Sequence, residues 1–113
     1  MTLPSETNPA QAEEWNAAES AAARTAVLNV RIDAARKVAP VYSTWKHKKG
    51  GLYQVMGYQI DTDTGRARIR YKRYGGPEYD ATAEKGVEFS RPVEEWTEDR
   101  FVATREGKPP VYR

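Results

Sequence analysis

Small apolar residues, mostly alanine, recur along the first third of the chain, and aromatic and β-branched residues are concentrated after it. Alanine favours helix because it loses no side-chain entropy there, whereas aromatic and β-branched side chains suit the pleated surface of a sheet. The pattern therefore predicts a helix over residues 11–38, followed by strands. Asn8 is the expected N-cap, and Pro40 ends the helix because the residue before a proline avoids the α conformation.

Residues 25–32 carry several β-branched side chains that a strand would also accept, and we interpret them as helix because alanine dominates on both sides. The apolar positions of this helix form more than one stripe. Two interpretations stay open: the helix folds across the sheet, or residues 10–38 associate with a second copy as a homo-oligomer. The side chains expected at such an interface are Trp15, Ala22, Val27, Leu28 and Val30.

A β-hairpin is predicted in the middle of the chain, and its second strand shows a clean alternation of apolar and polar residues. Residues 52–60 form its first strand, apolar on both faces and bent at Gly57, and residues 66–74 form its second. Residues 61–65 are typical of a turn because aspartate bonds local amides and glycine accepts a positive φ. Shorter elements are predicted beyond it: a strand over 87–91, a helical turn over 93–98, a strand over 100–105 and an extended tail over 107–113.

These elements predict an α+β fold, with a long N-terminal helix followed by a small antiparallel β domain. The β domain is expected to be an SH3-like barrel or a curled sheet, because its strands are short and closely spaced. The predicted divisions are a helical arm over 1–40, the β domain over 41–106 and the tail over 107–113.

Composition excludes several classes of function. The chain has 113 residues, no Cys and one His, so disulfides, thiolate sites and His-pair chemistry are excluded. No run of about 18 apolar residues is present, and the first residues lack the pattern of a signal peptide. We therefore expect a cytoplasmic protein that needs no membrane, metal or cofactor and is not an enzyme.

The net charge of +2 hides two oppositely charged segments. Residues 42–73 hold eight basic and two acidic residues, whereas residues 74–106 hold four basic and nine acidic ones. Four of the cations, here called the basic stripe, alternate along the second hairpin strand: Arg66, Arg68, Arg70 and Lys72. Like charges on one strand face repel, so something must compensate them. Either the acidic segment folds beside the stripe, or an anion binds it: a nucleic acid, a nucleotide or an acidic protein surface.

The residues expected to bind such an anion are Lys48, Lys49, Arg66, Arg68, Arg70 and Lys72, with Tyr71 and His47 beside them. Aromatic side chains next to cations suit nucleic-acid bases, although so small a domain also needs its aromatic residues for the core. His47 is either a general base or, more simply, a structural histidine bonded to the backbone. The 61–65 turn resembles the start of a calcium loop, but Gly65 and Tyr71 stand where that loop requires ligands.

Residues 45–55 read Trp-Lys-His-Lys-Lys-Gly-Gly-Leu-Tyr-Gln-Val. With the later Thr64-Gly65, Tyr71, Tyr74, Arg91-Pro92, Trp96 and Arg100-Phe101, this segment resembles a small bacterial and phage family known as domain of unknown function sixteen-fifty-three. The match covers residues 42–105; Lys48 replaces the family's usual tyrosine, and the loop over 75–86 is longer. The resemblance implies a small β domain encoded by phages or mobile elements, and carries no settled activity.

The sequence thus predicts a non-enzymatic binding module, an accessory protein that binds an anionic ligand or a host protein. The alternative is a structural subunit that makes protein–protein contacts through its N-terminal helix.

Overall fold

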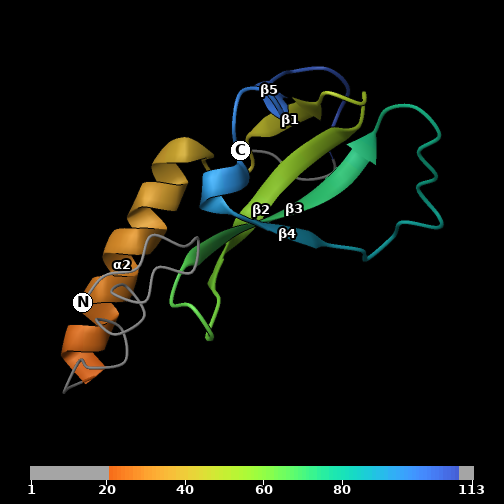
Figure 1. Ribbon diagram of the computed structural model, residues 1–113. Helices are drawn as coiled ribbons and strands as arrows, with labels where there is room; N and C mark the ends of the chain where they lie inside the picture. Colours follow the sequence, from red (N-terminus) through yellow and green to blue (C-terminus); the bar gives the residue numbers. More distant parts are fainter. Residues whose placement is uncertain (1–20, 110–113) are drawn as a thin grey trace.

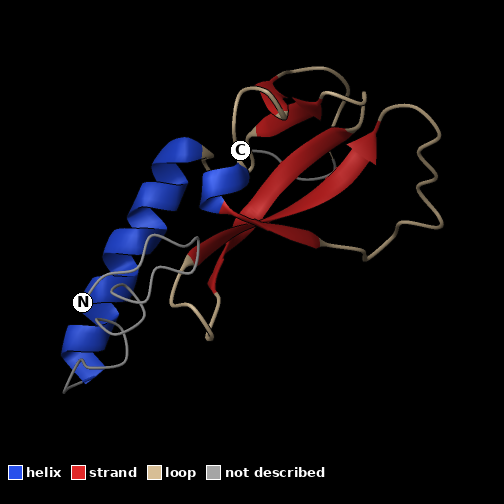
Figure 2. Ribbon diagram, viewed as in Figure 1, coloured by secondary structure: helices blue, strands red, loops and turns tan. Residues whose placement is uncertain are grey.

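The computed structural model describes residues 21–109, which form one helix and a five-stranded antiparallel sheet (Figure 1). The elements are α2 (Ala21–Val38), β1 (Thr44–His47), β2 (Leu52–Ile60), β3 (Ala67–Gly75), β4 (Phe89–Pro92), the short 3-10 helix η1 (Val93–Glu95) and β5 (Phe101–Ala103). The strand order is β4-β3-β2-β1-β5. The sheet is twisted and not closed, and α2 lies along one side of it (Figure 2). The α+β prediction is therefore confirmed.

The helix α2 confirms the helical interpretation of residues 25–32. One face of α2 packs on β2 and β3, where Ala35 and the following Ala39 are fully buried and Ile32 contacts the core. Arg36 lies over the Tyr58 ring, 5.5 Å from its centroid. The helix thus folds against the sheet, as one of the two interpretations held. Residues 11–20 of the predicted helix lie outside the described residues.

The predicted hairpin is present as β2 and β3. Its register shifts between Val55 and Gly57, so the bend expected at Gly57 is a bulge. In the connecting turn the Asp61 side chain accepts the Asp63 amide at 2.9 Å, and Gly65 has φ 71°. These contacts confirm the turn chemistry read from the sequence.

Several bounds differ from those predicted. The strand β1 was not predicted, because its four residues Thr-Trp-Lys-His carry too few alternations to stand out. The later strands are shorter than predicted: β4 covers Phe89–Pro92 rather than 87–91, and β5 covers Phe101–Ala103 rather than 100–105. The predicted helical turn is the single 3-10 turn η1 over Val93–Glu95, which leaves Trp96 just beyond it.

The core lies on the concave face of the sheet. Val55 and Ile69 are fully buried there, and Tyr71 is 6% exposed. Trp96 and Phe101 stack face to face with ring centroids 4.0 Å apart, and Tyr71 meets the Trp96 ring edge-on at 5.1 Å. Helix α2 covers one end of this core, and aromatic rings fill the other end.

Candidate functional site

The basic stripe lies on the face of β3 opposite the core, and its three arginines contact carboxylates. Arg66 pairs with Glu94 at 3.0 Å and Arg70 with Glu88 at 2.9 Å. Arg68 donates to the Ser90 hydroxyl at 3.0 Å and to the Ser90 carbonyl at 3.2 Å, and lies 3.9 Å from Asp61. Two of these carboxylates come from the acidic segment, which folds beside the stripe through β4 and η1. The acidic segment therefore balances part of the charge of the basic stripe, as in the first of the two alternatives predicted from the sequence.

A second group of cations surrounds the turn between β1 and β2. Gly50 has φ 100°, a conformation that a three-residue hairpin loop needs at its last position, and its amide donates to the His47 carbonyl at 2.7 Å. The Lys48 amide donates to the Arg100 carbonyl at 2.9 Å, which ties the turn to the start of β5. The Lys49 amide donates to His47 Nδ1 at 3.1 Å. The backbone therefore fixes where both lysines leave the turn.

His47 lies in a positive electrostatic environment. Burial lowers the pKa of its imidazole below the usual 6.5, and four neighbouring cations lower that pKa further: Arg91, Lys48, Lys49 and Arg100. We call His47 and these four residues the turn cluster. Within residues 21–109, Lys48, Lys49 and Arg100 form no ion pair. The turn cluster is therefore less compensated than the basic stripe.

Acidic groups approach the turn cluster at two points. Arg91 pairs with Glu95 at 2.9 Å. Asp99 is fully exposed; its pKa is lowered first by the Thr97 hydroxyl and, more weakly, by the charges of Arg100 and Lys48. Neither acid contacts Lys49, so the tip of the turn keeps its positive charge.

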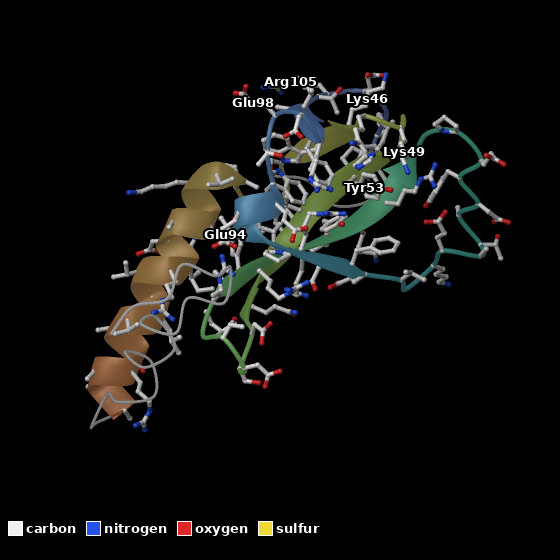
Figure 3. All side chains as sticks on the ribbon, viewed as in Figure 1. Lys46, Lys49, Tyr53, Glu94, Glu98 and Arg105 are labelled. Carbon is white, nitrogen blue, oxygen red and sulfur yellow. The ribbon has the colours of Figure 1, made fainter. Side chains whose placement is uncertain are left out.

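Three partly exposed rings contact one another in sequence, beginning with His47 of the turn cluster and ending with Phe89 on β4. The centroids of His47 and Tyr53 are 6.4 Å apart, and those of Tyr53 and Phe89 are 6.3 Å apart. Phe89 is 39% exposed although it lies in a strand. Figure 3 shows Lys49 and Tyr53 together at one end of the sheet, away from Glu94. We call His47, Tyr53 and Phe89 the ring row.

The long loop between β3 and β4 borders the ring row and is held by Arg73. Its guanidinium donates to the Gly75 carbonyl at 3.0 Å, lies 3.8 Å from Glu84 and sits 5.8 Å from the centroid of Tyr79. Burial raises the pKa of Tyr53, and the positive charge of Arg73 partly opposes that rise. The ring row thus has cations at its His47 end and near Tyr53 in its middle.

The structure separates the binding residues expected from the sequence. Lys48, Lys49 and His47 lie together at the turn, whereas the basic stripe lies on the convex face. Tyr71 points into the core, so its ring is a packing residue rather than a surface for a ligand. The sequence did not single out Arg91, Arg100, Tyr53 and Phe89 as one group. Arg100 reaches the turn because β1 pairs with β5, where His47 lies opposite Phe101. That pairing is a tertiary contact, and no local pattern in the sequence indicated it.

The helix residues expected at an oligomer interface differ in exposure. Val30 is 69% exposed, Ala22 is exposed, and Val27 and Leu28 are half-buried. Trp15 lies outside the described residues. No second copy of the chain is present, so a homo-oligomer through residues 10–38 stays a prediction.

Two grooves on the described surface are considered; of the ring row, only His47 lines one of them, and Tyr53 and Phe89 line neither. One of about 340 Å³ runs beside Lys46, His47 and Lys48, and one of about 990 Å³ lies between residues 40–44 and 103–109. The larger groove lies away from the turn cluster. Tyr42, Arg105 and Lys108 are among its lining residues, and we give it less weight because the ring row does not reach it. The candidate site is therefore an open surface. The part of the chain that the structure describes holds no group of three metal-ligating residues and no helix able to cross a membrane.

Comparisons with protein-family models, with curated proteins and with solved structures gave no match to this chain.

Proposed function

We propose that the protein is a non-enzymatic binding module that holds a phosphate-bearing ligand, a nucleotide or a nucleic acid, at the turn cluster. The observation that carries the proposal is the charge around His47: the four charged groups with the largest effect on it are all cations. A phosphate placed there would supply the negative charge that Lys48 and Lys49 lack. Phosphate recognition by lysine and arginine is the dominant source of affinity in nucleic-acid binding.

The turn cluster is a better candidate than the basic stripe because of what each would lose on binding. An anion at the stripe has to displace Glu94 or Glu88 from an arginine that is already paired. An anion at Lys48 and Lys49 displaces only water, since both side chains are exposed. The backbone hydrogen bonds of the turn hold the two lysines near each other before a ligand arrives, which reduces the ordering needed on binding.

The test is an oligonucleotide titration of the double variant Lys48→Ala/Lys49→Ala, followed by fluorescence anisotropy at several salt concentrations. Each lost phosphate contact should reduce the slope of log affinity against log salt by about 0.7 for a single strand. We expect the double variant to bind at least about tenfold more weakly, with a slope lower by about one to one and a half.

The matched control is Lys37→Ala/Lys72→Ala, which removes the same charge from α2 and from the basic stripe. We expect this control to bind almost as well as the unchanged protein. An equal loss in both double variants would contradict a site at the turn cluster and indicate attraction by net charge alone. Unchanged binding in Lys48→Ala/Lys49→Ala, with loss in Arg68→Ala/Arg70→Ala, would move the site to the stripe.

Two finer predictions belong to this proposal. We propose that the curled sheet is a partly open barrel of the SH3-like type, which the strand order, its strong twist and its single shared core support. The setting as a phage or mobile-element accessory protein is supported by the family resemblance of residues 42–105. A host protein with an acidic surface would meet the same cations, and failure of the oligonucleotides to bind in the titration above would favour that ligand instead.

A further inference from the structure

The ring row indicates which phosphate-bearing ligand fits best. Resting on the function proposed above, we infer that the ligand is a single-stranded nucleic acid whose bases stack on Phe89 and Tyr53 while its phosphates meet Lys48 and Lys49. Base–aromatic stacking beside a positively charged surface is the general basis of single-strand binding. Phe89 carries this inference because a large ring on an edge strand stays 39% exposed, with its centroid 6.3 Å from that of Tyr53, the ring that neighbours His47.

The angles between the rings favour a single strand over a duplex. The planes of Tyr53 and Phe89 meet at 83°, and those of His47 and Tyr53 meet at 74°. Bases in a duplex lie parallel at about 3.4 Å along each strand, so a duplex cannot place bases on two rings that are nearly perpendicular and about 6 Å apart. A single strand can turn each base separately, because its bases are not held by pairing.

The charges along the ring row fit a chain of phosphates better than one phosphate. Lys48 and Lys49 lie at the His47 end. Arg73 and Arg91 both act on Tyr53 near the middle; Glu84 lies 3.8 Å from Arg73 and Glu95 lies 2.9 Å from Arg91, so a phosphate there competes with a carboxylate, as it does not at Lys48 and Lys49. Cations at successive points along a row of rings match a backbone that carries one charge per nucleotide. A mononucleotide would use only one end of this arrangement.

The open form of the site supports the same ligand class. Neither groove of the surface is lined by Tyr53 or Phe89, so the rings do not close over a small molecule. An extended strand can enter and leave an open surface in both directions, whereas a free nucleotide would leave most of its own surface in water. The long β3–β4 loop, held by Arg73 to Glu84, forms one border of the row.

The test compares three labelled probes with the full chain at one salt concentration. The probes are a single-stranded DNA of about 12 nucleotides, within the length that small single-strand-binding folds cover, a duplex of the same sequence, and inorganic polyphosphate. The variant is Phe89→Leu, which keeps an apolar side chain for packing and removes the stacking ring. Its control is Val102→Ala, which trims another exposed apolar side chain, on β5.

We expect the single strand to bind more tightly than the duplex or polyphosphate. Phe89→Leu should weaken single-strand binding by about tenfold, in line with the loss of one stacked base, and leave polyphosphate binding unchanged. Val102→Ala should alter neither. Circular dichroism and the thermal midpoint of each variant check that the fold is retained, and Phe89→Tyr, which restores a ring, should recover the affinity.

Two results would overturn the inference, and they are distinguishable. If polyphosphate binds as tightly as the single strand and Phe89→Leu changes nothing, the ligand is a polyanion recognised by charge, and only the proposed function survives. If none of the three probes binds, the proposed function fails as well.

Discussion

The basic stripe and the turn cluster both carry several positive charges, yet they differ in what faces each charge. On the stripe, Arg66 and Arg70 contact carboxylates at 3.0 and 2.9 Å, and the hairpin strand is joined to β4 through these contacts. At the turn, Lys48 and Lys49 are exposed and form no ion pair within residues 21–109. The stripe therefore contributes to the fold, and the turn cluster is available to a ligand.

The comparison shows that density of charge along a sequence does not identify a binding surface. Alternating arginines in a strand are conspicuous, but the segment that leads into a neighbouring strand can supply their counter-charges, as Glu88 does just before β4. Two lysines in a tight turn are less conspicuous, and neither forms an ion pair within residues 21–109. The two regions differ in whether carboxylates lie beside their cations, and that depends on tertiary contacts.

The largest expected effect comes from the packing that holds the turn cluster in place. Gly76 has φ 100°, and an added Cβ would lie 2.5 Å from the Gly50 carbonyl oxygen, inside the β1–β2 turn. Gly76→Ala combines the cost of a left-handed conformation with a backbone overlap, so we expect it to lower the free energy of unfolding by about 3 kcal/mol. Urea denaturation measures the change, and oligonucleotide affinity should fall with it.

The control is Gly86→Ala in the same loop. Gly86 also has a positive φ, of 80°, but an added Cβ would meet nothing within 4 Å. This variant should lower the free energy of unfolding by only about 1 kcal/mol, from backbone conformation alone, and leave binding unchanged. Equal destabilisation by the two variants would contradict the close packing of the loop against the turn.

An intermediate effect is expected from breaking an ion pair of the stripe. The pair of Arg70 and Glu88 is partly exposed, with side-chain exposures of 36% and 38%. A double-mutant cycle with Arg70→Ala and Glu88→Ala should give a coupling energy of about 0.5 kcal/mol, in the range of such pairs. Lys48→Ala should leave stability almost unchanged because Lys48 is exposed and forms no ion pair within residues 21–109. A coupling energy of zero together with strong DNA binding by Arg70 would reverse the roles of the two regions.

The smallest effect is the pH dependence contributed by His47. Burial and the surrounding cations hold the folded pKa of His47 below 6.5, so the unfolded chain binds the proton more readily. His47 therefore opposes folding as pH falls from about 6.5 through its folded pKa, and this contribution vanishes above about 6.5. Protonation would also end the hydrogen bond in which Nδ1 accepts the Lys49 amide. The single imidazole can be followed by NMR without ambiguity.

Titration with a ligand sharpens this last measurement. A phosphate bound at the turn cluster adds negative charge beside the imidazole, which should raise the pKa of His47 relative to the free protein. His47→Gln should remove the corresponding part of the pH dependence of stability. An unchanged His47 pKa in the presence of saturating oligonucleotide would show that the bound phosphates lie elsewhere.

Much of the fold could be predicted from the sequence because its signals are local. Alanine density specified α2, the apolar run after Gly50-Gly51 specified β2, and alternation specified β3. The 61–65 turn followed from aspartate and glycine chemistry. The strand β1 was not predicted because a segment of four residues is too short to show a clear alternation. Its strand conformation depends on pairing with β2 and β5. The same reason explains why β5 is shorter than predicted: only the residues that reach β1 pair.

Part of the candidate site could also be predicted from the sequence. Lys48, Lys49 and His47 were singled out from their neighbouring positions in one segment. Arg91 and Arg100 join them only through the sheet, from positions far along the chain. Phe89 looked like an ordinary strand residue, and its exposed position follows from β4 lying at the edge of the sheet.

The sequence by itself determined the helix, the central hairpin and the separation of basic from acidic segments, because propensity, alternation and charge act between near neighbours. Only the tertiary structure decided which cations are compensated. The acidic segment was long enough to cover either region, and the pairing of β4 with β3 brought its carboxylates to the stripe. A charge is balanced by what lies within a few ångströms of it, and that distance is set by chain packing rather than by position in the sequence.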